Sequence, residues 1–264
     1  MKKSIRLLLG NVVMWLGVFL FGCIVTAYGK TNPISDYSRS EEKEAFSIQE
    51  ENYEKENLNS DNNQKKVAYL TFDDGPSNHS EQLLDLLEEE GVKATFFVVA
   101  KDDVESERIY QRIVRDGHGL GLHSYSHVYE KIYSSPELFQ EDLWKLKTFL
   151  YHKTGVSCNI YRFPGGSSNS MMKFPIEDCK EFLEEKNIRY FDWNSSAEDA
   201  VCVGSSPDVL LKRVLKDALK YNHPVILMHD LNCCETTLNM VRPLIRRLKQ
   251  EGYAFDRLTC DTNL

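Results

Sequence analysis

The sequence predicts an α/β fold in the form of a small, incomplete or distorted (β/α) barrel. From residue 66 onward, short apolar runs typical of buried strands alternate with amphipathic stretches typical of helices. Alternation at this pace indicates parallel strands joined by crossover helices. About six such units in roughly 190 residues suit a barrel smaller than the common eightfold one. A doubly wound open sheet is the alternative.

The expected elements follow one another in strict alternation. The strands are predicted at 67–72, 94–99, 119–122, 159–163, 188–193 and 225–228. The helices are predicted at 81–90, 104–116, 137–154, 176–186, 207–221 and 237–251. In both candidate folds, functional groups gather at the carboxyl ends of the strands. Polar residues directly after each apolar run are therefore the candidates for a site.

The N-terminal 30 residues predict a membrane anchor. Three basic residues, Lys2, Lys3 and Arg6, precede an apolar run that extends from residue 7 to about residue 28. This pattern is typical of an export signal or an uncleaved signal-anchor. The length of the run favours a single-pass anchor at 1–30 with its N-terminus inside. Cleavage of the segment, which would release a secreted protein, is the alternative.

Residues 31–65 predict a disordered acidic linker between this anchor and the folded domain. The segment is polar and lacks apolar periodicity. It carries most of the net charge of −8, so the domain itself is close to neutral. The domain is expected at 66–252, with a C-terminal extension at 253–264. No basic field suggests a nucleic-acid partner.

Six cysteines follow the predicted anchor, and none shows the Cys-x-x-Cys spacing of a zinc site. The sequence does not decide whether these cysteines are paired. Disulfides would suit an oxidising environment, and free buried thiols remain the alternative.

Two adjacent carboxylates, Asp73 and Asp74, end the first predicted strand, and Gly75-Pro76 forces a turn directly after them. Adjacent carboxylates repel each other unless something compensates. A metal ion would do so, with one Asp as a ligand and the other free as a base. A solvated turn is the alternative.

Further candidates follow three later strands. His123 and His127 are four residues apart, a spacing that can place two imidazoles on one face and, with one carboxylate, form an open metal tripod. Arg162 precedes Pro164-Gly165-Gly166, a turn whose backbone N–H groups could bind an oxyanion. His229 ends the last apolar run, where a carboxylate could raise its pKa and make it a general acid.

Taken together, these residues resemble the polysaccharide deacetylases with the NodB homology domain, carbohydrate esterase family 4. The resemblance covers about residues 66–252 and rests on four motifs in the family's order: Thr71–Ser77, His123–His127, Arg162–Pro164 and Leu227–His229. It implies the NodB-type barrel. The chain departs from the family at Gly165, where a Tyr is usual, and a missing ring there would widen the cleft.

The resemblance also implies a role for each matching residue. Asp73 would be the general base, oriented by Arg162, and His229 would protonate the leaving amine. Asp74, His123 and His127 would hold one divalent metal, for which zinc is the first choice and cobalt, nickel or manganese are alternatives. The oxyanion or substrate would contact Pro164, Gly165 and Trp193. The carboxylate that tunes His229 is Asp199 or, alternatively, Asp192.

The implied activity is metal-dependent hydrolysis of N-acetyl groups on a polysaccharide. The anchor and linker predict that the domain lies just outside a bacterial membrane, where peptidoglycan N-acetylglucosamine is the nearest substrate. Chitooligosaccharides, O-acetyl xylan or another acetylated glycan are the alternatives, as is a non-catalytic glycan-binding module. The expected partners are a cell-wall polysaccharide and the membrane, and the sequence identifies no protein partner.

Overall fold

The computed structural model describes residues 65–201 and 204–264. The predicted anchor at 1–30 and residues 31–64 of the predicted linker lie outside this part of the chain. Among the helices that the structure describes, none has both the length and the apolar character that a membrane span requires.

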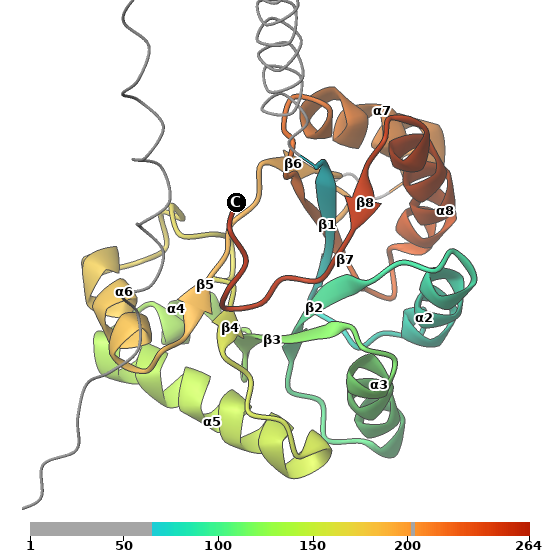
Figure 1. Cartoon of the computed structure of the whole chain (residues 1–264). Helices are drawn as coiled ribbons and strands as arrows, with labels where there is room; N and C mark the ends of the chain where they lie inside the picture. The colour runs from blue at the N-terminus through green and yellow to red at the C-terminus, as the bar shows by residue number, and fades with distance from the viewer. Residues whose placement is uncertain (1–64, 202–203) are drawn as a thin grey trace, which may run out of the picture. The chain divides into compact units, whose positions relative to one another are not determined.

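The described chain alternates strands and helices, with the strands inside and most helices around them (Figure 1). The strands are β1 (Val67–Asp73), β2 (Ala94–Val99), β3 (Gly119–Ser124), β4 (Ile160–Tyr161), β5 (Arg189–Tyr190), β6 (Ser195–Ser196), β7 (Val225–His229) and β8 (Ala254–Phe255). The helices are α2 (Ser80–Glu89), α3 (Val104–Arg115), α4 (Tyr129–Ile132), α5 (Pro136–Thr154), α6 (Ile176–Glu185), α7 (Pro207–Ala218) and α8 (Glu235–Gln250).

The sheet confirms the incomplete (β/α) barrel. Its strands pair in the order β5-β4-β3-β2-β1-β7-β6, and every pair is parallel. This order follows the chain around a circle with one break, because β5 and β6 are not paired in the part that the structure describes. A doubly wound sheet would instead reverse its strand order at an internal switch point.

The sequence pattern found the long elements and missed the short ones. The six predicted helices are present, with ends shifted by at most three residues, but α4, β6 and β8 were not predicted. The ladders of β4 and β5 are two residues long, shorter than the apolar runs at 159–163 and 188–193. Apolar character reports burial on both faces, whereas a ladder also needs a paired neighbour. Past the end of β4, a single hydrogen bond from the Arg162 N–H to Leu122 O (2.9 Å) still joins the chain to β3.

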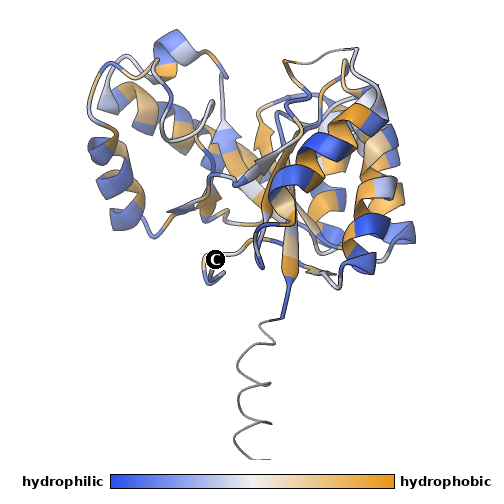
Figure 2. Ribbon diagram, turned by 90° about the horizontal axis from the view of Figure 1, so that it is seen from above, coloured by the Kyte–Doolittle hydropathy of each residue, from blue (hydrophilic) through white to orange (hydrophobic). Residues whose placement is uncertain are grey.

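Local signals set the ends of the helices. Asp103 accepts a hydrogen bond from the N–H of Ser106 at the start of α3. Ser135 caps α5 in the same way, with Pro136 in its first turn, and Gly155 ends that helix in the left-handed conformation. The helices carry their hydrophobic residues toward the strands and their hydrophilic residues outward (Figure 2).

Two apolar clusters fill the two sides of the sheet. The larger one lies between strands and helices and includes Leu70 and Phe72 of β1. The smaller one contains Tyr69, Phe97, Ile160, Phe191, Val225 and Leu258. Because successive side chains of a strand point to opposite faces, Tyr69, Thr71 and Asp73 share the side of the smaller cluster.

Residues 253–264, predicted as an extension, contribute to the sheet. β8 pairs with the start of β1 through Val67↔Ala254 and Ala68↔Phe255. Leu258 is buried, and its N–H donates to the hydroxyl of Thr95 at 2.8 Å. The five cysteines that the structure describes, at 158, 179, 233, 234 and 260, are free thiols.

Candidate active site

The strand register brings three of the strand-end candidates, Asp73, His123 and His229, to one side of the sheet. Asp73 pairs in register with His229 on β7 and with Phe97 on β2. His123 lies two residues after Gly121, which pairs with Phe97. A Cβ at Gly121 would lie 2.5 Å from the Phe97 ring, so only glycine leaves room for that ring inside the barrel.

Asp73 forms a buried ion pair with Arg162. The guanidinium Nη1 lies 3.0 Å from Asp73 Oδ1, and Arg162 is fully buried. The same guanidinium donates to Thr71 Oγ1 (2.6 Å) and Phe191 O (2.9 Å) and stacks on Phe97 with a 4.3 Å centroid distance. Its planar group is thereby held in one orientation. Asp73 is thus a carboxyl group fixed in position at the base of the site.

Asp74, His123 and His127 converge on one point. The Nε2 atoms of His123 and His127 lie 3.3 and 3.0 Å from Asp74 Oδ1. Asp74 Oδ1 and His127 Nε2 are nevertheless buried without an aligned hydrogen-bond partner among the described residues. Buried polar atoms without partners are rare. The closeness of these unpaired nitrogen and oxygen atoms is therefore consistent with a cation bound between them. Two imidazoles and a carboxylate, whose candidate ligand atoms all lie within 4.8 Å of one another, are the donors of an open zinc site.

The chain itself holds two of these three candidate ligands in position, His123 and Asp74. His123 donates from Nδ1 to the carbonyl oxygen of Arg162 at 2.8 Å, which leaves Nε2 with its lone pair toward the site. Asp74 adopts a left-handed conformation (φ 72°), which is uncommon for a residue with a side chain and is found mainly where surrounding structure imposes it. Burial works to raise the pKa of Asp74, but the two neighbouring imidazoles outweigh it and hold that pKa far below its usual range.

A further carboxylate, Asp142 on α5, binds the three residues that separate His123 from His127. It accepts hydrogen bonds from Ser124 Oγ (2.7 Å), Tyr125 N (2.8 Å), Ser126 N (2.9 Å) and Ser126 Oγ (2.6 Å). Sequence reasoning missed this residue. The available signal was a charged residue on the buried face of a helix, next to Phe139, Leu143 and Leu146.

We expect Asp142→Ala to weaken zinc binding by about 10- to 100-fold, because partners that orient metal ligands typically contribute this much. Equilibrium dialysis of the purified protein against Zn²⁺ measures the change. Glu141→Gln is the matched control, because Glu141 is the preceding residue on α5 and only pairs with exposed Lys145. Equal zinc affinity in Asp142→Ala and the wild type would contradict the role of Asp142.

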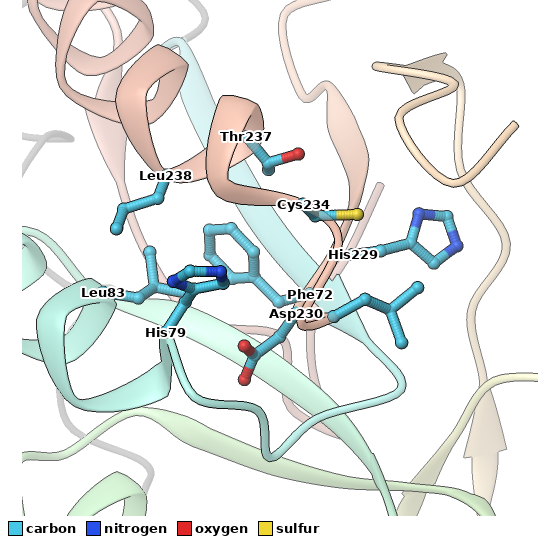
Figure 3. A pocket seen from close by; sticks show the side chains of 9 residues that line it. Phe72, His79, Leu83, His229, Asp230, Cys234, Thr237 and Leu238 are labelled. Atoms are coloured by element: carbon cyan, nitrogen blue, oxygen red, sulfur yellow. The ribbon is translucent and has the colours of Figure 1, made fainter. Parts of the chain in front are cut away.

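The structure pairs His229 with Asp199. The ring Nδ1 donates to Asp199 Oδ1 at 2.7 Å, and the backbone N–H of His229 donates to Asp199 Oδ2 at 2.9 Å. Thr237 Oγ1 also donates to Asp199 Oδ2 at 2.6 Å. Figure 3 shows Thr237 on the first turn of α8 and His229 at the end of β7. Nε2 is thus the ring nitrogen of His229 that remains for a substrate.

Burial and charge act in opposite directions on this pair. Burial works to lower the pKa of His229, but the hydrogen bond and charge of Asp199, followed by the charges of Asp73 and Asp74, raise it above its ordinary value. Burial works to raise the pKa of Asp199, and the partnership with His229 outweighs it, so that this pKa is lowered. The arrangement favours a protonated imidazole beside a charged carboxylate.

Asp192, the alternative partner of His229, holds the glycine-rich turn instead. Its carboxylate accepts hydrogen bonds from the N–H of Ser167 at 3.0 Å and from the Ser167 hydroxyl. Its backbone oxygen accepts from Arg162 Nη2 at 3.2 Å. Asp192 follows β5 and binds Ser167, not His229. Asp199 follows β6, which pairs with β7, and this position brings its carboxylate to His229.

The turn at Pro164-Gly165-Gly166 requires its glycines. Both have positive φ angles, 75° for Gly165 and 82° for Gly166. A Cβ at Gly166 would lie 3.0 Å from the Trp193 ring. The carbonyl of Pro164 accepts from the buried Tyr133 hydroxyl at 2.8 Å, which fixes the turn to the end of α4. Trp193 therefore lies against this turn, in which Gly165 is the exposed residue.

Tyr129, at the start of α4, lies beside this turn and was missed by sequence reasoning. Its ring is perpendicular to that of His127 with a 5.3 Å centroid distance. Burial, with the charges of Asp74 and Asp73, raises the pKa of its hydroxyl. Tyr129 fills space beside Gly165, so the missing side chain at position 165 does not leave an open cleft there. The short helix lacks the periodicity that would have revealed it.

Comparison with known proteins agrees with this geometry. A sequence profile described as Polysaccharide deacetylase matches residues 60–179. A peptidoglycan-N-acetylglucosamine deacetylase of Bacillus cereus (strain ATCC 14579) is 30% identical over 197 residues, which are 73% of this chain and 69% of that protein. The relative of the same name from Listeria monocytogenes serotype 1/2a (strain 10403S) is 30% identical over 192 residues, but the match spans only 37% of its length.

A solved structure gives the same result in three dimensions. The catalytic domain of peptidoglycan N-acetylglucosamine deacetylase from Eubacterium rectale ATCC 33656 superposes with a TM-score of 0.71 at 34% identity. The match covers 75% of this chain and 91% of that domain. Both the sequence and the fold thus lead to one conclusion: the chain belongs to the polysaccharide deacetylase family of hydrolases.

Proposed function

We propose that this protein hydrolyses the N-acetyl group of N-acetylglucosamine in peptidoglycan and that it requires a divalent metal, with zinc as the first choice. One observation carries the proposal. The buried Asp73–Arg162 pair lies beside the three converging ligands and in register with His229, whose partner is Asp199. A base, a ligand set and an acid are therefore present at one mouth of the barrel. The names of the relatives support the choice of peptidoglycan.

A divalent ion at Asp74, His123 and His127 would supply Lewis-acid chemistry at the acetyl carbonyl. Asp73, oriented by Arg162, accepts a proton from the attacking water. The backbone N–H of Gly165 donates a hydrogen bond to the developing oxyanion. His229 then donates a proton from Nε2 to the departing nitrogen as the C–N bond breaks, which yields acetate and the free amine. Asp199 stabilises the charged form of His229.

We further propose that the domain acts outside a bacterial membrane, held by the segment at 1–30. The support is the basic and apolar pattern of that segment and the acidic character of 31–65. Secretion after cleavage is the competing arrangement. Fractionation of cells that express the full chain, followed by protease treatment of intact cells, distinguishes an exposed anchored domain from a secreted one.

The test of the activity is acetate release from three substrates under the same conditions. Zinc-loaded protein is incubated with muropeptides, chitooligosaccharides and acetylated xylan, and acetate is quantified in each. We expect the highest kcat/KM on the muropeptides. A higher kcat/KM on either other substrate would contradict the peptidoglycan assignment. Binding of all three without acetate release would identify a glycan-binding module and contradict the enzymatic proposal.

A further inference from the structure

Tyr129 lies against the backbone that faces the proposed reaction centre. A Cβ on Gly165 would lie 3.3 Å from Tyr129 Cε2 and 3.7 Å from its hydroxyl oxygen. These distances are ordinary or slightly tight van der Waals contacts. The phenol ring therefore covers the space into which a side chain at position 165 would project, and its hydroxyl is part of that surface.

The ring is held from behind, independently of any ligand. His127 contacts it on one side, and Tyr133 packs against it edge to face with a 6.0 Å centroid distance. Tyr133 is fully buried, and its hydroxyl binds the carbonyl of Pro164. Tyr129 thus bridges the loop of the metal ligands and the glycine-rich turn. A group fixed in this way loses little conformational entropy when it binds a ligand.

Tyr129 lies nearer the protein surface than the proposed catalytic residues. Asp73, His123 and Arg162 are at most 3% exposed and form the floor. Tyr129 is only partly buried and lies at the rim. An N-acetyl group must place its carbonyl at the floor to react, so the sugar that carries it occupies the rim.

The chemistry of Tyr129 suits a sugar. A phenol offers an apolar face and a polar tip, as does the surface of a pyranose ring. Within residues 65–201 and 204–264, no hydrogen bond engages the Tyr129 hydroxyl, so it can donate to or accept from a sugar hydroxyl without breaking a protein contact.

We propose that Tyr129 is a substrate-binding residue that contacts the sugar ring of the N-acetylated unit, with its hydroxyl bonded to a sugar hydroxyl. The inference rests on the proposed function and deepens it, because it assigns recognition of the sugar to the helix that follows the metal ligands. Recognition of the acetyl group and recognition of the sugar are then carried by different residues.

The test compares a substrate that has a sugar with one that has none. We measure kcat/KM for a chitooligosaccharide and for 4-nitrophenyl acetate, with zinc content determined for each protein. We expect Tyr129→Ala to lower kcat/KM about tenfold more on the oligosaccharide than on 4-nitrophenyl acetate, the equivalent of one ring contact and one hydrogen bond. Tyr125→Phe is the matched control, because Tyr125 lies on the same loop but packs against Phe149 of α5.

A second variant keeps the test decisive if the alanine protein does not fold. Tyr129→Phe retains the ring and should raise the KM for the oligosaccharide about threefold, with zinc content unchanged. An unchanged KM overturns the proposal. An equal loss on both substrates in Tyr129→Ala also overturns it, because the effect would then lie at the metal or in the fold.

Direct binding separates this inference from the proposed function. The dissociation constant of the oligosaccharide is measured by calorimetry in Asp73→Asn, with and without Tyr129→Phe. Weaker binding in the double variant supports the sugar contact even if the wild type releases no acetate, a result that would contradict the proposed function alone. Equal binding in the two proteins overturns the contact.

Discussion

Asp73→Asn is expected to lower the rate of acetate release by about 10³-fold, within the range that a positioned general base contributes. The amide is nearly the same size as the carboxylate and can still accept the hydrogen bond of Arg162, now 3.0 Å from Asp73 Oδ1. It cannot accept a proton from water at neutral pH. The geometry of the site should therefore survive while the reaction fails.

The measurement pairs activity with metal content. Asp73→Asn should bind zinc as the wild type does, because Asp74, His123 and His127 are unchanged. His123→Ala is the contrasting variant and should lose both zinc and activity, since it removes one of the three converging ligands. Full acetate release by Asp73→Asn would remove this residue from the role of base. Full zinc content in His123→Ala would remove the ligand assignment.

The second large effect is expected at Asp199. Asp199→Asn should lower kcat/KM by about 10²- to 10³-fold, because it removes the charge that stabilises protonated His229 and one of the two oxygens that accept hydrogen bonds from this residue. The same change should alter the pH dependence. His229 acts as an acid only below its pKa, and Asp199 contributes to raising that pKa. Without this charge the pKa falls, so activity should decline at lower pH than in the wild type.

The pH profile of kcat/KM measures the shift of the basic limb. Thr237→Val serves as the control, because it removes one hydrogen bond to Asp199 Oδ2 and keeps the carboxylate charge. Its basic limb should move less than that of Asp199→Asn. An unshifted limb in Asp199→Asn would show that a different group sets the decline. Asp192→Asn should leave the limb in place, since Asp192 binds Ser167.

The long elements were predictable because each depends on local pattern. The strand β1 and the helix α5 carry continuous signals of burial or capping that do not need distant partners. α4, β6 and β8 are two to four residues long and exist because of tertiary contacts. β8, for example, forms only where the start of β1 offers an unpaired edge. A propensity signal over two residues is too weak to predict such pairing.

The candidate site divides in the same way. Motif order and strand ends were enough to gather Asp73, Asp74, His123, His127, Arg162 and His229 as candidates from the sequence. The sequence favoured Asp199 over Asp192 without deciding between them, because Asp192 lies at the end of the fifth predicted strand and Asp199 follows it seven residues later. The choice depends on which of the two carboxylates the folded chain places next to His229 at the end of β7. Asp142 and Tyr129 likewise could not be found from the sequence, because their contacts are with residues far away along the chain. Asp142 on α5 binds the backbone of Tyr125, and Tyr129 on α4 lies beside Gly165.

By itself, the sequence determined the parallel (β/α) architecture, the family and the residue types at the mouth of the barrel. Periodicity and strand-end positions are local properties, and the chain carries them wherever it folds. The tertiary structure decided the partners: Asp73 with Arg162, His229 with Asp199, and Tyr129 beside Gly165. These pairs join segments far apart along the chain, and only the packing of the sheet and its helices fixes distances of about 3 Å between them.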